Sequence, residues 1–207
     1  MTPSAIEALF TRADGQYLFA RWGRPIVPVV FGVDEATLAL VKGAVEAVVT
    51  LAGHRMAETD PELGANLMVF FFRDWAELPE VPNLDRLVEG LGPLCARLEA
   101  AEANQYRVFR FDAAGAIRAA FVFIRMDAHL EAVPAEALAL SQAAQVMLLW
   151  SDRAFTESSP LAMAGETLVL RPEIGAVIRA GYDPVLPAMA DQPSHAYRLA
   201  ARIGPEI

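Results

Sequence analysis

The chain has 207 residues, which fits one domain, with a core expected at about residues 22–150 and an irregular, helical C-terminal portion at about 151–207. Hydrophobic residues make up 55% of it, which excludes an intrinsically disordered chain. The formal net charge of −9 and the presence of a single lysine, Lys42, argue against a nucleic-acid partner and an anionic membrane surface. One cysteine, Cys95, excludes an internal disulfide and a cysteine-rich metal site.

The location of the protein is predicted from two features of the sequence. The first twenty residues lack the basic and apolar regions of a signal peptide. The longest apolar runs, such as residues 67–72, are much shorter than the ~20 residues that a membrane-spanning helix needs. We therefore expect an acidic cytoplasmic protein without membrane insertion.

The first predicted elements alternate between strand and helix. Residues 26–33 are rich in β-branched side chains and predict a strand, in which Pro28 indicates a sheet edge. Asp34 is a good N-cap for the amphipathic helix that is expected to end at Gly53. The uninterrupted apolar run at residues 67–72 predicts a central strand that is covered on both faces.

A helical stretch and a hairpin follow. Residues 83–98 carry an apolar stripe, which predicts either one helix capped by Asn83 and kinked at Gly92-Pro93 or two shorter helices. Residues 106–112 and 117–126 flank a short glycine-containing turn, so they predict an antiparallel hairpin.

The remaining elements are mainly helical. We expect a helix from Pro134 to about residue 149, a loop at 151–165, a short extended segment at 167–170, and a helix from 172 to about 180. Ser194 is expected to cap a last helix at 195–203. This order of elements predicts an α+β fold with a mixed β-sheet.

The residue types that most often carry catalysis or bind metals give weak signals. His54 follows a helix, whose dipole favours a partly charged imidazole, and His129 and His195 are expected at the solvated surface. Cys95 lies on an apolar helix stripe, which favours a buried, inert thiol. No two histidines have the spacing of a zinc site, so we expect no metal and no cofactor.

The other motifs also give no specific signal of function. Glu58, Asp60 and Glu62 are close together, but they lack the spacing of a calcium loop and are interpreted as a solvated turn. Trp75 follows the central strand and is expected to pack in the core rather than to contact a ligand. The sequence contains no glycine-rich phosphate-binding motif and no Gly-x-Ser-x-Gly nucleophile motif.

The helix at residues 135–149 is the most informative segment. It is almost wholly apolar, and a helix that is apolar all round is normally buried. Ser141, Gln142 and Gln145 interrupt it, so the two amides either find hydrogen-bond partners inside the protein or face a cleft.

The order strand, helix, strand and strand before this helix resembles the zincin metallopeptidase arrangement. In that fold the helix carries His-Glu-x-x-His, and this chain has the run Ser141-Gln142-Ala143-Ala144-Gln145 in the corresponding register. Neutral amides and a hydroxyl are poor zinc ligands, and glutamine cannot act as a general base as glutamate can.

The chain more closely resembles an uncharacterised proteobacterial family of zincin-like domains with altered active-site residues, many of them predicted lipoproteins or secreted proteins. The residues that carry this resemblance are Trp22, Pro25, Asn66, Gln145, Asp152, the run Tyr182-Asp183-Pro184, Leu186 and Met189. The chain departs from the family at Ser141 and Gln142, where acidic residues are usual, and in having no export signal.

The resemblance implies a non-catalytic domain, a pseudoenzyme, whose former active-site groove binds a peptide segment or a small polar ligand. In zincin-like folds an edge strand beside the helix receives the substrate backbone, and such strand addition needs no chemistry. The groove residues that we expect are Ser141, Gln142, Gln145, Asp152, Tyr182 and Asp183.

Two alternatives come from other classes of protein. One is a hydrolase that uses an unconventional metal site or a carboxylate such as Asp152 or Asp183. The other is a structural or assembly protein, which is favoured if residues 190–207 fill the groove. The sequence does not define an oligomeric state.

Overall fold

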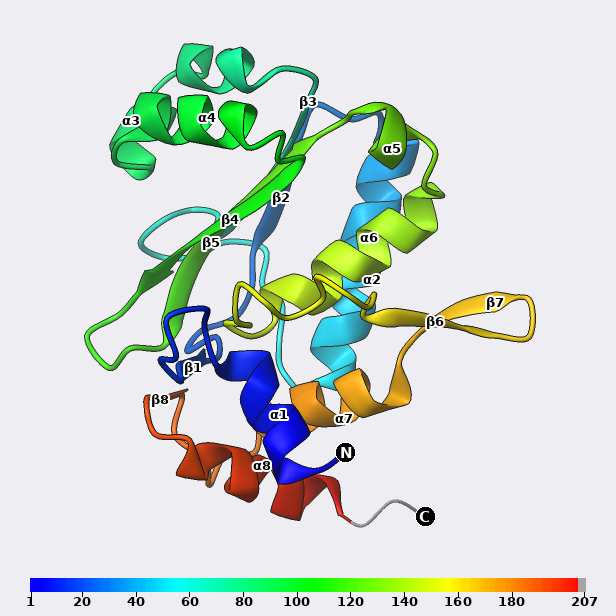
Figure 1. The fold of residues 1–207 in the computed structure, drawn as a ribbon. Coiled ribbons are helices and arrows are strands. Elements are labelled where there is room, and N and C mark those ends of the chain that lie inside the picture. Colours follow the sequence, from blue (N-terminus) through cyan, green and yellow to red (C-terminus); the bar gives the residue numbers. More distant parts are fainter. Residues whose placement is uncertain (205–207) are drawn as a thin grey trace.

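A computed structural model describes residues 1–204, in which helices pack on both faces of a small mixed β-sheet (Figure 1). The helices are α1 (Pro3–Phe10), α2 (Glu35–Leu51), the 3₁₀ helix η1 (Trp75–Glu80), α3 (Leu84–Leu87), α4 (Leu91–Ala100), α5 (Ala128–Glu131), α6 (Ala135–Val146), α7 (Pro172–Gly181) and α8 (Ser194–Ile203). The strands are β1 (Phe19–Ala20), β2 (Pro28–Phe31), β3 (Leu67–Phe72), β4 (Gln105–Phe111), β5 (Ile117–Arg125), β6 (Leu161–Ala164), β7 (Thr167–Leu170) and β8 (Met189–Ala190). The predicted α+β class is confirmed.

The main sheet has the strand order β2, β3, β5, β4. Strand β3 is parallel to both β2 and β5, and β4 is antiparallel to β5. The predictions that Pro28 marks a sheet edge, that residues 67–72 form a central strand, and that β4 and β5 form a hairpin are confirmed. The sheet therefore has two edges, β2 and β4.

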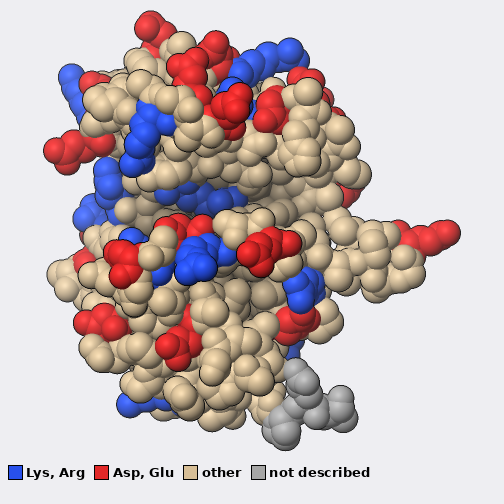
Figure 2. Space-filling view, viewed as in Figure 1, with Lys and Arg blue, Asp and Glu red and all other residues tan. Residues whose placement is uncertain are grey.

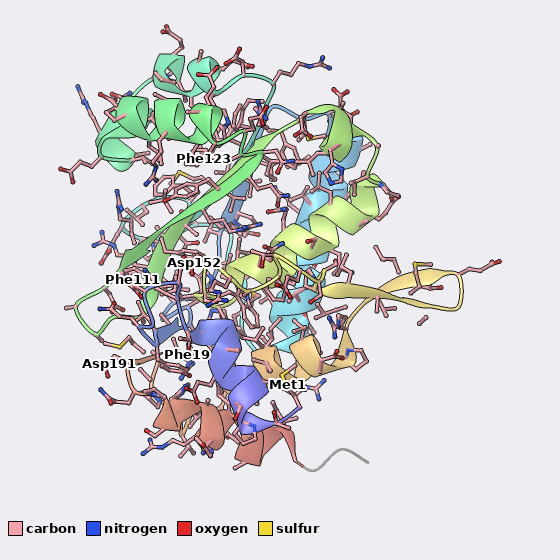
Figure 3. All side chains as sticks on the ribbon, in the orientation of Figure 1. Met1, Phe19, Phe111, Phe123, Asp152 and Asp191 are labelled. Atoms are coloured by element: carbon pink, nitrogen blue, oxygen red, sulfur yellow. The ribbon has the colours of Figure 1, made fainter. Side chains whose placement is uncertain are left out.

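Both faces of the sheet are covered, because successive side chains of a strand point to opposite sides. On β3, Leu67 and Val69 belong to the larger core beneath α2 and α6, whereas Phe70 and Phe72 belong to a second core beneath η1 and α4. Phe123 of β5 lies in this second core (Figure 3). This double burial explains why residues 67–72 are uninterruptedly apolar.

The second core confirms two predictions about single side chains. Cys95 is a buried residue of α4, and burial raises the pKa of its thiol. Trp75 is 1% exposed, and its indole N–H donates to the carbonyl of Ala103 at 2.9 Å. Both are packing residues.

Helix α2 begins as predicted, because the Asp34 carboxylate accepts a hydrogen bond from the backbone N–H of Thr37 at 2.8 Å. It packs against α6 on the sheet, and α7 and α8 pack with α1 at the end of this layer (Figure 1). Pro172 lies in the first turn of α7, where a backbone N–H would have no acceptor within the helix, so its absence in proline costs no hydrogen bond. None of the helices in residues 1–204 is long and apolar enough to cross a membrane.

Residues 83–98 form two helices, α3 and α4, which is the alternative to one kinked helix. The break lies before Gly92-Pro93, at Gly90, whose φ of +70° is left-handed. Pro93 fits inside the first turn of α4, where backbone N–H groups are free in any case. Asn83 occupies the N-cap position of α3 as predicted, but it has φ +62° and its side chain makes no capping bond. Ser194 lies inside α8 and does not cap it, so that prediction is wrong.

Three other elements differ from the prediction. Helix α6 ends at Val146, because the backbone of Leu148 and Leu149 pairs with residues 20–21 instead. Strand β6 lies within the predicted loop at 151–165 and pairs with β7 in a hairpin that projects from the body of the protein (Figure 1). Helix α1, capped by Thr2, has no counterpart in the prediction.

Candidate functional site

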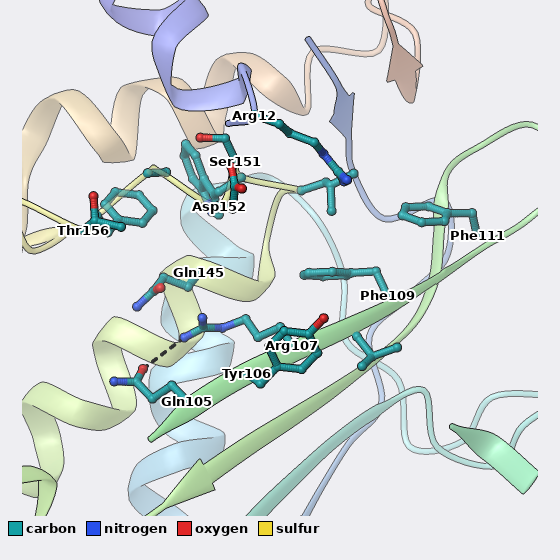
Figure 4. Close-up of a pocket in the computed structure, with 15 residues that line it drawn as sticks. Arg12, Gln105, Tyr106, Arg107, Phe109, Phe111, Gln145, Ser151, Asp152 and Thr156 are labelled. Carbon is teal, nitrogen blue, oxygen red and sulfur yellow. Dashed lines mark hydrogen bonds between the residues drawn. The ribbon is translucent and has the colours of Figure 1, made fainter. Parts of the chain in front are cut away.

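The free edge of β4 faces a cleft of about 570 Å³, whose other wall is the segment at residues 149–156 that follows α6 (Figure 4). Tyr106 and Val108 line it together with Arg107 and Phe109, which lie on the opposite face of the strand. The cleft therefore runs along the strand edge, and we name it the β4 cleft. Figure 2 shows a hollow across the middle of this side of the molecule, with basic side chains in it.

The backbone of β4 offers unused hydrogen-bonding groups to the β4 cleft. In an antiparallel pair, the N–H and C=O groups of alternate residues bond to the partner strand, and those of the others point away. Asn104 bonds to Arg125 through its carbonyl at 2.8 Å, which fixes this alternation. The backbone groups of Gln105, Arg107 and Phe109 therefore point away from β5, toward the free edge.

Arg107 lies at the bottom of the β4 cleft and is held by amides. Its Nη2 donates to Oε1 of Gln142 at 2.6 Å and to Oε1 of Gln105 at 3.3 Å. The Gln142 amide in turn donates to Oε1 of Gln105 at 2.6 Å. The side chain keeps some contact with solvent, but its Nε is buried without a partner in residues 1–204. Burial lowers the pKa of Arg107 to about 10.

Of the three predicted polar residues of α6, only Gln145 lines the β4 cleft; Ser141 and Gln142 lie beside it and are bonded to lining residues. Gln142 is 4% exposed and fully engaged with β4, which matches the expectation of a satisfied structural amide. Gln145 lines the β4 cleft, and its amide donates to Oγ of Ser141 at 2.9 Å. Gln142 therefore has hydrogen-bond partners inside the protein, whereas Gln145 faces a cleft.

The opposite wall contains Asp152, which is exposed and lines the β4 cleft. Its carboxylate accepts a hydrogen bond from the backbone N–H of Ala13 at 3.0 Å. Trp150 stacks on Phe10 with ring centroids 5.2 Å apart and meets Phe155 edge to face at 5.1 Å. These contacts fix residues 149–156 against α1, so the wall is built from packed side chains.

Two predicted groove residues, Tyr182 and Asp183, lie outside the β4 cleft. The Tyr182 hydroxyl donates to the carbonyl of Met147 at 2.8 Å and accepts from the N–H of Trp22 at 3.4 Å, and burial raises its pKa. Asp183 accepts a hydrogen bond from Nε of Arg202 at 2.7 Å. These bonds attach the end of α7 to the core and to α8. Tyr182 and Asp183 line a separate pocket together with Arg202, so they do not share the β4 cleft with Gln145 and Asp152.

The histidines depart from the prediction at two positions. His195 is 3% exposed instead of solvated; its Nδ1 lies 3.0 Å from the hydroxyl of Tyr17, and its buried Nε2 has no partner within residues 1–204. Burial lowers the pKa of His195 to about 4. His54 bonds to the carbonyl of Arg24 at 2.8 Å, and burial lowers its pKa, which opposes the charged form that the helix dipole favours. His129 is exposed, as predicted.

The acidic loop is not a solvated turn throughout. Asp60 is 5% exposed and accepts hydrogen bonds from the side chain of Asn66 at 3.0 Å and from the backbone N–H groups of Glu62 and Leu63 at 2.9 Å. Burial opposes ionisation of Asp60, but these hydrogen bonds outweigh it and lower the pKa. Within residues 1–204 there is no cluster of three or more His, Cys, Asp or Glu side chains placed to hold a metal ion.

The β4 cleft thus combines a free strand edge, two guanidinium groups, two side-chain amides, a carboxylate and aromatic rings. In the described part of the chain, no histidine lines it, and the hydroxyl of Ser141 accepts a hydrogen bond from an amide rather than facing a base. Residues 190–204 do not line it either, so the described C-terminal segment leaves it open. These groups are suited to binding a ligand with both polar and apolar parts.

Comparisons of this chain with protein-family models, with curated proteins and with solved structures find no match.

Proposed function

We propose that the chain is a zincin-like domain without catalytic activity that binds an extended peptide segment in the β4 cleft by adding it to the sheet as a further strand. The observation that carries this proposal is the free edge of β4, where Gln105, Arg107 and Phe109 direct backbone groups into an open cleft. A strand edge with unpaired N–H and C=O groups is a template for pairing with another chain.

The surroundings of the edge favour a specific ligand over unspecific aggregation. Exposed edges are usually protected by charges, bulges or covering segments. Here residues 149–156 lie across from β4 and enclose with it a cleft of about 570 Å³, which we expect to hold a single extended segment. Phe109 and Trp150 supply apolar surface for its side chains.

The zincin-like part of the proposal is supported by the placement of α6. The helix that carries the run Ser141 to Gln145 lies beside the antiparallel edge strand, which is where the resemblance expects the degenerate active-site helix.

Panning a displayed library of random heptapeptides on the immobilised chain, followed by fluorescence polarisation with the selected peptides, tests this function. We expect N-methylation of alternate peptide amides to weaken binding at least tenfold, and N-methylation of the amides between them to have little effect, because only alternate groups face β4. Filling the cleft by Gln145→Trp is expected to abolish binding. Glu136→Trp, on an exposed position of the same helix outside the cleft, is the matched control.

Failure to select any peptide refutes the proposal. Binding that survives Gln145→Trp, or that shows no two-residue period in the N-methyl scan, also refutes it.

A further inference from the structure

Arg107 is one of four partly shielded arginines that form no ion pair in the described chain; the others are Arg12, Arg21 and Arg110. Arg21 and Arg110 each donate to a backbone carbonyl, whereas Arg107 is bonded only to side-chain amides and lies in the β4 cleft. Arg24, Arg171 and Arg202 each form an ion pair with a carboxylate. Arg107 has no acidic partner within residues 1–204, and both of its hydrogen bonds use Nη2 and neutral amide oxygens. Its Nη1 makes no hydrogen bond in the described chain.

A shielded cation without a counter-charge is costly, because burial removes its hydration and nothing of opposite charge compensates. The lowered pKa of Arg107 reports this cost, although at about 10 the side chain remains charged at neutral pH. Gln105 and Gln142 fix the orientation of the guanidinium without neutralising it. The side chain is therefore positioned and left ready for an anion that comes from outside the described chain.

The strand geometry defines where such an anion would enter. Residues directly opposite each other on adjacent strands place their side chains on the same face of the sheet. A peptide residue opposite Arg107 would therefore place its side chain on the same face of the sheet as the Arg107 side chain, whose guanidinium is bonded to Gln142 of α6. Two residues further, the same face of β4 carries Phe109, which would meet an apolar side chain.

We propose that the ligand of the β4 cleft is an extended peptide with an aspartate or glutamate that pairs with Arg107 and an apolar residue two positions away that contacts Phe109. This inference rests on the proposed peptide-binding function and names its ligand class. Carboxylate is the anion that matches the planar guanidinium and occurs in every acidic peptide segment.

The other charges around the β4 cleft make this recognition local. Arg12 lines the opposite wall and adds a second cation, whereas Asp152 on that wall is acidic. The net charge of −9 repels an acidic peptide at long range. Affinity for an acidic residue must therefore come from contact with a cation in the cleft rather than from attraction to the whole surface, and Arg107 is the cation that lies on β4 itself.

The test uses a selected peptide in versions with Glu, Gln or Lys at the acidic position, measured by fluorescence polarisation. On the wild-type chain we expect the Glu peptide to bind at least tenfold more tightly than the Gln peptide, and the Lys peptide more weakly still. In Arg107→Gln the difference between Glu and Gln is expected to disappear. Arg110→Gln, on the opposite face of the same strand, is the matched control and is expected to keep it.

The outcomes separate this inference from the function on which it rests. If peptides bind with the two-residue N-methyl period but show no preference for Glu, strand addition stands and the acidic ligand class is overturned. If the preference persists in Arg107→Gln, another cation carries it and the assignment to Arg107 is overturned. If no peptide binds, both proposals fail. The comparison of peptides on the wild-type chain decides the acidic ligand class even if Arg107→Gln does not fold.

Discussion

The buried imidazole of His195 leads to a quantitative prediction about acid stability. In the folded protein, burial and then the charges of Arg198 and Arg202 lower the pKa of His195 from 6.5 to about 4. In the unfolded chain the imidazole takes up a proton near pH 6.5, while in the folded chain it stays neutral until about pH 4. Protons therefore favour the unfolded state throughout this window, and this part of the stability is present above pH 6.5 and lost as the pH falls.

The difference between the two pKa values corresponds to a loss of about 3 kcal/mol in the free energy of unfolding at pH 4. Urea unfolding at pH 7, 5.5 and 4, followed by tryptophan fluorescence, measures it. We expect His195→Asn to lose about 3 kcal/mol less than the wild-type chain between pH 7 and pH 4. The carboxylates contribute equally to both proteins, so the comparison isolates the imidazole.

His129→Asn is the matched control, because His129 is exposed, and we expect it to follow the wild-type pH dependence. The reasoning about His195 is refuted if the wild-type chain and His195→Asn lose the same free energy of unfolding over this range.

Two further predictions concern the scaffold. Gly32 has φ +80°, and a Cβ there would lie 2.0 Å from the carbonyl oxygen of Phe71, so Gly32→Ala is expected to lower the free energy of unfolding by at least about 3 kcal/mol. Gly43 lies at an exposed position in α2, and a Cβ added there would have no atom within 4 Å, so Gly43→Ala is expected to raise the free energy of unfolding by about 0.5–1 kcal/mol. Thermal unfolding measures both variants, and a change of the same sign in Gly32→Ala and Gly43→Ala contradicts this pair of predictions. Asn66 is fully buried and accepts from the N–H of Val27 at 2.8 Å while its amide donates to two oxygens. We expect Asn66→Ala to cost about 3 kcal/mol in urea unfolding, and a loss below about 1 kcal/mol would show that water replaces these bonds.

The sheet could be predicted from the sequence because its strands carry strong local signals. The apolar run at residues 67–72 indicates burial on both faces, and β3 is indeed flanked by two strands and by helices on each side. Pro28 places β2 at an edge for the simple reason that proline has no N–H to donate. Strand β6 gave no such signal, because residues 161–164 follow a serine- and glutamate-containing stretch and acquire their conformation by pairing with β7.

The candidate site could be predicted only in part. Two amides on an apolar helix indicate either internal partners or a cleft, and Gln142 and Gln145 show one outcome each. Arg107 was missed: it lies in the predicted strand at residues 106–112, but its pairing with Gln142 depends on a contact between segments far apart in the chain. Tyr182 was predicted as a groove residue from the family resemblance alone. Its role in attaching α7 could not be predicted, because it depends on contacts with residues far away in the chain.

The hairpin β6–β7 has a consequence for the exchange of backbone amide hydrogens with solvent. Its base is anchored, because Leu170 packs against the main core, whereas Met163 near the tip is 62% exposed and the tip residue Gly165 has open space around it. The amides near the tip can therefore exchange through a local opening that leaves α6 and the main sheet intact. We expect their exchange to be fast and nearly independent of denaturant, and protection to increase from Met163 toward Leu170, where opening begins to require separation of the core.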